Sequence, residues 1–486
     1  MEEKILQSYR VKEHLLDEVF DHNGTIKKPY KKLYSHFNKY NSEDFRKVND
    51  ATKLSFLMQG ITFATYAENP KGTERIFPFD LMPRIITSTE WAELEKGLIQ
   101  RNLAINLFLK DIYNDKKILK DKVVPSELIF SSVNYNKYMV DFEPPGGIYN
   151  HISGTDLIKH SDGKFYVLED NVRCPSGVSY VLSNRDALKK ALSLLFKELR
   201  VGTVFDYAEA LSTCLHSVAP EGVDSATCAV LTPGMYNAAY FEHSFLAQSM
   251  GLQLVEGRDL FVDHGFLYMK TIYGKKKLDV LYRRVDDEFL DPLVYRADSM
   301  LGVPGLMDVY RQGNVSIINA PGTGASDDKA VYSFIPQIIK YYLDEDPILN
   351  NVHTYQCEIP AEMDHVLNNM ENLVIKPVDQ SGGYGIFIGS GASKAEIEEM
   401  KQKIKSDPRE YVAQPIMNLS THSTFIEESN CFEPRHVDLR AFTLLGHDYQ
   451  YILKGGLTRV ALKKDSLIVN SSQGGGSKDT WVADVE

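Results

Sequence analysis

The sequence has few cysteines and no run of apolar residues long enough to cross a bilayer. Its five cysteines are scattered through 486 residues without CxxC spacing, so the pattern predicts neither a disulfide framework nor a zinc site. No apolar core follows the charged first residues, and we therefore expect a cytoplasmic protein without a membrane partner. Cys174 has no identifiable base in its surroundings, which favours a packed thiol over a nucleophile.

The chain also lacks an excess of positive charge. A formal net charge of -12 and a pI near 5.6 argue against nucleic acid as a partner. With 43% hydrophobic and 25% charged residues, a chain of 486 residues can bury more than one core, and we expect several packed units. The composition carries no information on the oligomeric state.

Among the features that are present, the segment 167–177, VLEDNVRCPSG, is the most informative. It reads as the end of a strand, whose period of two places Glu169 and Asn171 on one face. Asp156 ends an earlier strand, and the turn signal SDG at 161–163 predicts a hairpin that brings the three side chains together. Carboxylate and amide oxygens suit Mg²⁺. A solvated hairpin with a polar edge is the competing interpretation.

A second cluster lies at 373–389, LVIKPVDQSGGYGIFIG. A β-rich segment ends near Lys376, and a glycine-rich turn leads into another β-rich segment. Glycines let the backbone approach a polyanion closely, while the lysine supplies a point charge. We expect the turn to become ordered when nucleotide binds, although a plain hairpin remains the alternative. The residues expected at the phosphates are Lys376, Ser381, Gly382, Gly383, Tyr384 and Gly385.

Further cationic residues lie at strand and helix positions. The segment 326–343 predicts a helix with Ser326 as N-cap, which places Lys329 in the first turn, a position that favours a nearby anion. Two predicted strands, 435–446 and 451–462, carry Arg440 and Arg459, whose planar groups can bind phosphate or carboxylate in a bidentate manner.

Together these residues resemble the ATP-grasp superfamily. Asp156, Glu169 and Asn171 come first, and Lys329, Lys376, the SGGYG loop, the segment 438–440 and Arg459 follow. This is the order of the circularly permuted ATP-grasp proteins, and glutathionylspermidine synthetases share it. The similarity covers nearly the whole chain, including the segments 61–84, 230–251, 281–293 and 471–481.

The resemblance implies an ATP-dependent carboxylate–amine ligase that forms an amide or peptide bond through an acyl phosphate. ATP and Mg²⁺ are the implied cofactors, and a small-molecule or peptide carboxylate and an amine are the implied substrates. It implies a metal site at Asp156, Glu169 and Asn171, and nucleotide contacts from Lys329, Lys376, Gln414 and the glycine-rich loop. Arg440, Arg459 and Glu169 are the implied catalytic residues, and Arg75 and Arg84 the implied substrate-binding residues.

Two alternatives stay open. One is a phosphotransferase of the same fold that stops at a phosphorylated product, and the other is a nucleotide-binding subunit without turnover. His151, His422 and His436 are expected to be structural, because a lone histidine near a strand is more often a satisfied core residue than an acid–base group.

The expected fold is mixed α/β, a circularly permuted ATP-grasp with a parallel α/β domain and a helical N-terminal cap. We expect the cap at 1–135, with a helix over 90–115, and the metal-binding half at 136–225, with a helix over 184–198. The α/β domain is expected at 226–325, because an apolar strand, a Pro-Gly turn, a helix and a second strand indicate a βαβ unit. The lid and the second half of the core are expected at 326–486.

Overall fold

A large mixed β-sheet forms the centre of the molecule in the computed structural model, which describes residues 5–65, 73–379, 385–470 and 473–485. The strands follow the order β13-β5-β4-β19-β21-β22-β3, and β18 and β20 also pair with β19. The β13–β5 and β22–β3 pairs are parallel, and the others are antiparallel. The strands are β3 (Phe79–Thr87), β4 (Ile152–Lys159), β5 (Phe165–Asn171), β13 (Asn350–Asn351), β18 (Thr421–Ile426), β19 (Cys431–Gly446), β20 (Tyr449–Ile452), β21 (Leu457–Val460) and β22 (Gly476–Ala483).

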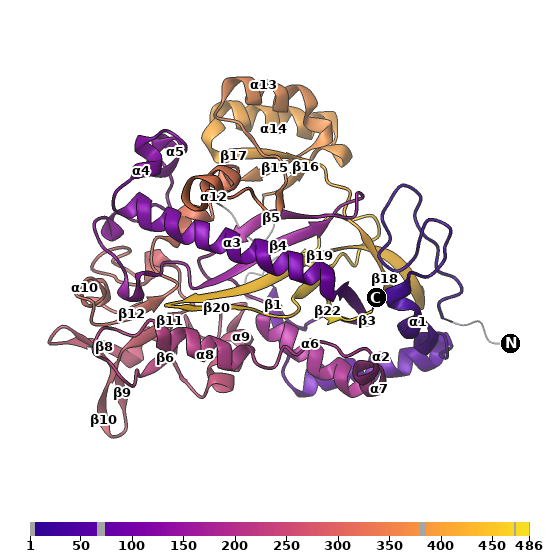
Figure 1. Ribbon diagram of the computed structural model, residues 1–486, viewed down its shortest axis with the longest axis horizontal. Helices are drawn as coiled ribbons and strands as arrows, with labels where there is room; N and C mark the ends of the chain where they lie inside the picture. Colours follow the sequence, from indigo (N-terminus) through magenta and orange to yellow (C-terminus); the bar gives the residue numbers. More distant parts are fainter. Residues whose placement is uncertain (1–4, 66–72, 380–384, 471–472, 486) are drawn as a thin grey trace.

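Helix α3 (Ser88–Tyr113) covers one face of this sheet and crosses the front of the molecule in Figure 1. Thr87 and Glu90 form a capping box at its start, which satisfies backbone donors that a helix leaves unpaired. Leu94 and Leu98 of the helix lie in one apolar cluster with Leu157 of the sheet. The helix predicted over 90–115 is therefore confirmed.

The opposite face of the sheet packs against α6 (Val178–Ala191) and α8 (Tyr207–Ser217). Successive residues of a strand point to opposite faces, and in β19 Leu439 joins the α3 cluster while Phe442 joins the α6 and α8 cluster. Arg440 lies two residues before Phe442 in β19, so its side chain is on the same face of the sheet as that of Phe442. The polar residues of the site therefore lie on the face of the sheet that α6 covers.

A separate parallel sheet has the order β12-β11-β6-β7. Strand β6 (Cys228–Leu231), helix α9 (Tyr240–Met250) and strand β7 (Gln253–Val255) confirm the predicted βαβ unit. Gly251 ends α9 with a positive φ of 67°, which glycine adopts without strain. The other elements of this region are β8 (Leu260–Asp263), β9 (Phe266–Thr271) and β10 (Gly274–Leu278), which form a projecting antiparallel sheet, and β11 (Val280–Arg283), α10 (Leu306–Arg311) and β12 (Ser316–Ile318).

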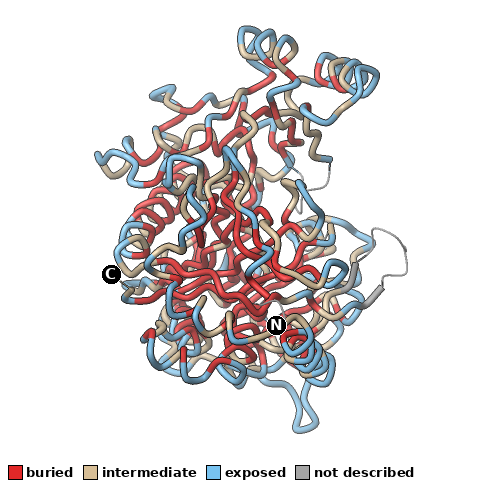
Figure 2. Tube along the Cα trace, turned by 90° about the vertical axis from the view of Figure 1, so that its right-hand side faces the viewer, coloured by how far each residue is buried: buried red, intermediate tan, exposed pale blue. Residues whose placement is uncertain are grey.

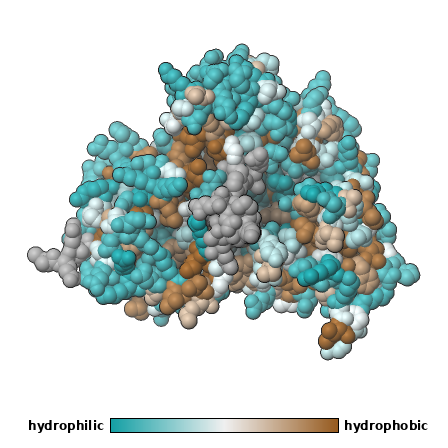
Figure 3. All heavy atoms as spheres, turned by 180° about the vertical axis from the view of Figure 1, so that it is seen from behind, coloured by the Kyte–Doolittle hydropathy of each residue, from teal (hydrophilic) through white to brown (hydrophobic). Residues whose placement is uncertain are grey.

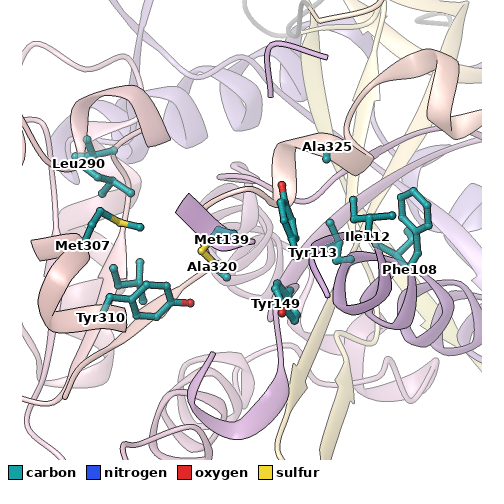
Figure 4. Packing of buried hydrophobic residues seen from close by; sticks show 14 of the residues in the cluster. Phe108, Ile112, Tyr113, Met139, Tyr149, Leu290, Met307, Tyr310, Ala320 and Ala325 are labelled. Atoms are coloured by element: carbon teal, nitrogen blue, oxygen red, sulfur yellow. The ribbon is translucent and has the colours of Figure 1, made fainter. Parts of the chain in front are cut away.

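The parallel unit is joined to α3 by a continuous apolar core. Figure 4 shows Phe108 and Tyr113 of α3 on one side of this core and Met307 and Tyr310 of α10 on the other. All four side chains are almost completely buried. This packing fixes the unit to the body of the molecule.

The lid subdomain, residues 355–415, lies above the sheet at the top of Figure 1. Its strands follow the order β14-β17-β15-β16, and its helices share a small core with them that includes Val366, Ile375 and Ile404. The elements are β14 (Tyr355–Gln356), α13 (Pro360–Asn369), β15 (Leu373–Pro377), β16 (Phe387–Ile388), α14 (Lys394–Ser406) and β17 (Tyr411–Pro415).

Three predicted elements differ from those observed. The helix expected over 326–343 is interrupted and forms α11 (Lys329–Tyr332) and α12 (Ile335–Leu343), and Asp328, not Ser326, caps α11 through the backbone N–H of Ala330. The helix expected over 184–198 starts earlier, as α6, and continues as α7 (Ser193–Glu198). The strand expected over 451–462 divides into β20 and β21 around Gly455, whose φ of 143° suits glycine.

The first part of the chain contributes both helices and strands. Strand β3 forms one edge of the large sheet, while β1 (Thr62–Thr65) and β2 (Thr73–Ile76) form a separate hairpin. The division of the chain into four domains stays a prediction. The remaining helices are α1 (Lys31–Phe37), α2 (Ser42–Met58), α4 (Lys117–Lys120) and α5 (Ser126–Phe130).

Buried residues are concentrated along the central sheet and the elements packed on it (Figure 2). Seen from behind, hydrophobic residues gather in a hollow beneath the lid subdomain (Figure 3). Within the described ranges, no helix has the length and apolar character needed to span a membrane.

Candidate active site

The β4–β5 hairpin positions two carboxylates side by side. Asp156 lies directly opposite Glu169, and Asn171 lies opposite Gly154. Residues directly opposed across an antiparallel pair share a face, so these polar side chains lie on one face of the hairpin. A β-bulge at this point breaks the alternation, which lets Val167 pack on the α3 side while Glu169 turns to the other face.

Two arginines hold Asp156. Arg440 lies opposite it in β19 and donates from Nε and Nη2 to its two oxygens at 2.6 and 2.8 Å. Nη2 of Arg459 donates to Oδ2 at 2.7 Å. Burial opposes ionisation of this carboxyl, but the two guanidinium groups outweigh it and hold the pKa of Asp156 well below its ordinary value. Gly154 makes room for this arrangement, because a Cβ there would come within 3.2 Å of Cδ of Arg440.

Asp438 completes a compact group of charges. Nε of Arg459 donates to both of its oxygens, at 3.0 and 3.1 Å. With Asp156 and Arg440, the group contains two arginines and two aspartates and is electrically balanced. Its members come from β4, β19 and β21, so the large sheet rather than a local motif assembles it.

Two lysines, Lys329 and Lys376, lie near Glu169 on the lid side of the site. Nζ of Lys329, the first residue of α11, lies 3.9 Å from Oε2 of Glu169. Lys376 of β15 is 8% exposed, and burial, with a contribution from Lys329, lowers its pKa to about 8 although Glu169 acts in the opposite sense. A cation kept in such a dry position suits an anionic ligand.

These residues line a hollow between the large sheet and the lid subdomain, which we call the lid hollow. Gln414 of β17 lies in its wall, and its Nε2 donates to Oγ1 of Thr354 at 2.9 Å. The charged end consists of Asp156, Glu169, Lys329, Lys376, Asp438 and Arg459, and the apolar part of Leu168, Val374, Ile386, Ile388, Met417, Leu419, Leu467, Ile468 and Val469.

Of the three side chains expected to bind a metal, two have oxygen atoms that are placed to bind a hard cation. Nδ2 of Asn171 donates to the carbonyl of Gly154 at 3.1 Å, which leaves Oδ1 as the ligand atom of this amide. The Glu169 side chain is 21% exposed and reaches the hollow. Both residues therefore fit Mg²⁺. Asp156 fits a metal site only if Arg440 and Arg459 release its carboxylate. Among the described residues, no cluster of three or more His, Cys, Asp or Glu residues is suited to a metal.

The glycine-rich loop is described only at its end. Ser381, Gly382, Gly383 and Tyr384 lie outside the described residues. Gly385 is exposed and has a positive φ of 70°. The antiparallel pairing of β15 and β16 places the ends of the loop beside Lys376.

The two arginines expected to bind substrate have different surroundings. Arg84 is completely buried, donates from Nε and Nη2 to Glu18 at 2.8 and 2.6 Å, and donates from Nη1 to the carbonyl of Asp438. It holds the backbone of the site and cannot reach a substrate. Arg75 is exposed and lies opposite Phe63 in the β1–β2 hairpin.

That the cysteine and histidines near the site are structural stays a prediction. Burial raises the pKa of Cys174, whose sulfur lies 3.8 Å from Nη1 of Arg283, as the packed interpretation expects. His422 is fully buried against the hydroxyl of Tyr30, and burial holds its pKa well below the ordinary value. Burial likewise lowers the pKa of His151 to about 3 and that of His436.

Sequence reasoning missed two contributors. Asp438 was noted only as part of a motif, yet its spacing of two from Arg440 already predicts that both share a face of β19. Asn470 lines the lid hollow from an irregular segment, for which no periodic signal exists.

The cleft between the large sheet and the lid subdomain, with two lysines close to Glu169, agrees with the ATP-grasp class of protein. A family model described as circularly permuted ATP-grasp type 2 matches residues 83–461, and the chain belongs to this family. Membership implies that the chain binds ATP.

Relatives of similar length are uncharacterised. The protein sll0335 of Synechocystis is 47% identical over 98% of both chains, and Rv2411c of Mycobacterium tuberculosis is 48% identical over 96% of this chain and 83% of the relative. A protein of Frankia alni with the provisional name glutamate–cysteine ligase 2-3 is 38% identical over 96% of this chain. This chain spans 53% of that longer protein.

A solved structure supports the fold. The glutathione synthetase-like effector of Globodera pallida, in its apo form, superposes with a TM-score of 0.60 over 91% of this chain and 98% of its own. The two sequences are 12% identical, so the likeness concerns the fold alone.

Proposed function

We propose that this protein is an ATP-dependent carboxylate–amine ligase that forms an amide or peptide bond through an acyl phosphate. The observation that carries the proposal is a pair of adjoining hollows that share Arg459 and Asn470. The lid hollow holds the lysines and Glu169, and the second hollow holds Arg440 and Asn171. Nucleotide on one side and carboxylate on the other would meet at Arg459.

Each residue has a role that follows from its position. Lys329 and Lys376 neutralise phosphate oxygens, and Gln414 with the apolar wall holds the base and sugar. Glu169 and Asn171, and Asp156 once released, would hold Mg²⁺, which would offset the negative charge of the phosphates. Arg459 lies where negative charge develops during transfer.

The bond changes balance without a further reactant. A carboxylate oxygen attacks the γ-phosphorus, the bond to the β-phosphate oxygen breaks, and ADP leaves. The amine nitrogen then attacks the acyl carbon, phosphate leaves, and the amine proton passes to solvent. Positioning and charge neutralisation do most of the work in phosphoryl transfer, so no strong base is needed for the first step.

The provisional name of the Frankia relative supports a ligase assignment, because glutamate–cysteine ligases join a carboxylate to an amine. The substrates themselves are not transferred from that name. The identity between the two chains is 38%, and that protein is about twice as long.

An ADP-release screen tests the proposal. Mg-ATP is supplied with amino acids and short peptides as carboxylates, and hydroxylamine is added as an amine that captures acyl phosphate as a hydroxamate. ADP release that depends on a carboxylate, together with hydroxamate formation, is expected. A stable phosphorylated product that hydroxylamine does not convert would instead identify a phosphotransferase, and absence of ADP release with every carboxylate would favour a subunit without turnover.

Glu169→Gln should abolish the signal while Glu371→Gln leaves it intact. Glu371 is an exposed glutamate of the lid subdomain that does not line the lid hollow. The two substitutions remove the same charge, so a difference between them reports the site rather than the net charge.

A further inference from the structure

The second hollow, which we call the aromatic hollow, differs in character from the lid hollow. It is bounded by the β1–β2 hairpin, the turn before α6, the loop before α9 and the arginines of the site. We propose that it receives the side group of the carboxylate substrate and selects one that is apolar or aromatic. This inference rests on the proposed ligase function.

Charged groups are confined to one end of the hollow. Arg440 and Arg459 lie at this end, and both are ion-paired with Asp156. No aspartate or glutamate is among the described lining residues of the hollow itself. Its selectivity therefore depends on its apolar surface rather than on a net charge.

One wall is built from stacked aromatic rings. Phe77 and Tyr180 stack with centroids 3.8 Å apart and an interplanar angle of 11°, and Phe63 packs edge-on against both at 6.4 Å. The hydroxyl of Tyr180 donates to the carbonyl of Thr62 at 2.8 Å, so the polar group of this wall is already satisfied. The two stacked rings therefore form a rigid base on which Phe63 packs.

The wall is fixed before any ligand arrives. Phe77 is 1% exposed and Tyr180 is 3% exposed, and Phe241 of α9 stacks on the far side of Tyr180 at 5.6 Å. A preformed apolar surface costs little entropy when it is occupied. Phe63 is half-buried, and it is the ring that a ligand would cover further.

The polar groups lie at the opposite end, beside the point of phosphoryl transfer. Nη1 of Arg440 donates to the carbonyl of Ser176 at 3.2 Å, and Nη2 of Arg284 donates to the Ser176 hydroxyl at 2.5 Å. Asn171 lies in the lining beside them. A carboxylate held there has its side group directed along the aromatic wall.

Calorimetric titration tests the selectivity without turnover. N-acetylphenylalanine and N-acetylglycine are titrated into the protein with Mg²⁺ and a nonhydrolysable ATP analogue. We expect N-acetylphenylalanine to bind at least about tenfold more tightly, as burial of one aromatic side group allows. Equal affinities, or no binding of N-acetylphenylalanine, would overturn the inference.

Paired variants locate the binding. Phe63→Ala should remove the preference for N-acetylphenylalanine, and Phe63→Leu should retain most of it. Phe261→Ala is the matched control, because Phe261 is a half-buried ring that stacks on Tyr268 in the projecting sheet. A preference that survives Phe63→Ala in a protein of unchanged melting temperature would contradict the assignment.

The two proposals fail separately. Tight binding of N-acetylphenylalanine, with no ADP release from Mg-ATP in the presence of any carboxylate tested, would keep the aromatic hollow and reject the ligase. ADP release with N-acetylaspartate but not with N-acetylphenylalanine would keep the ligase and reject the apolar selectivity.

Discussion

At the residue scale, the groups that we propose to bind the metal and those that we propose to bind the nucleotide come from different elements. Glu169 lies on the hairpin with Asn171, whereas Lys376 lies across the hollow on the lid. We therefore expect Glu169→Gln to lower kcat at least about a hundredfold with little change in nucleotide affinity, because it weakens the metal that offsets charge during transfer.

Substitution of Lys376 should instead change the affinity for nucleotide. Lys376→Ala should raise the Kd for Mg-ATP about tenfold or more, because it removes a buried charge facing the phosphates. Equilibrium titration and steady-state kinetics of the two variants measure both effects. Near-normal behaviour of both proteins would remove these residues from the site.

The lowered pKa of Lys376 predicts a pH dependence of nucleotide binding. Burial brings this pKa from an ordinary value of 10.5 to about 8 in the free protein, so the side chain is charged below pH 8 and loses its proton above it. Phosphate favours the charged form, so the Kd for Mg-ATP should rise as the pH increases through 8. Binding near pH 8.5 should also take up protons, which calorimetry in two buffers of different ionisation enthalpy measures.

The pH dependence of the stability of the fold has the opposite sign: a rise in pH weakens nucleotide binding but stabilises the unliganded protein. Because the folded protein disfavours the charged lysine, this residue destabilises the unliganded fold below pH 8, and the penalty is relieved as the pH rises from 8 towards 10.5. Lys376→Met should lose both dependences. Proton uptake that persists in this variant would assign the titration to another group.

Local alternation was sufficient to place Glu169 and Asn171 on one face, because that signal involves residues two apart. The Asp156–Arg440 pair could not be predicted from the sequence, because it depends on the register between two strands whose paired residues are 284 positions apart. The same holds for Arg84, whose partner Glu18 comes from a segment with no regular pattern. A buried arginine and a substrate-binding arginine look alike in sequence.

At the element scale, long periodic helices and the β4–β5 hairpin could be predicted, and the ends and breaks of elements could not. Helix α3 carries a capping box and a sustained apolar stripe. The helix expected over 326–343 breaks because Pro336 starts a new helix, where its missing N–H costs nothing. Hydrophobic periodicity alone does not show where one helix ends and the next begins.

The lid subdomain has its own small core, and this predicts a local response to mutation. Ile404 of α14 is fully buried in that core. Ile404→Ala should cost about 2–5 kcal/mol, as removal of a buried branched side chain does. We expect the loss to appear as faster hydrogen exchange in β15, β17 and α14 and as weaker nucleotide binding.

Leu267→Ala is the matched control, because Leu267 is equally buried in β9, on the opposite side of the molecule. It should leave exchange in the lid unchanged. If Ile404→Ala accelerates exchange uniformly over the whole chain, the lid does not unfold as a separate unit.

At the scale of the whole molecule, buried ion pairs connect segments that are distant in sequence. Arg84 joins Glu18 to the backbone of Asp438, and Arg185 of α6 pairs with Asp479 of β22, with neither side chain exposed. Breaking one partner of such a pair leaves a buried charge unpaired and is strongly destabilising. These connections hold the sheet that carries Asp156 and Arg459, while the lid contributes Lys376 from above.

Because the lid hollow is lined from both parts, a ligand within it should stabilise the molecule as a whole. We expect Mg-ATP at one hundred times its Kd to add about 2.7 kcal/mol to the free energy of unfolding, since the native state alone binds it. Scanning calorimetry with Mg²⁺ alone and with Mg-ATP measures the rise in melting temperature. Lys394→Ala, which removes an exposed lysine at the start of α14, should keep the full rise, whereas Lys376→Ala at the same Mg-ATP concentration should lose about half of it. An equal response of these two variants would mean that the nucleotide binds outside the lid hollow, and an unchanged melting temperature in the unmodified protein would contradict nucleotide binding itself.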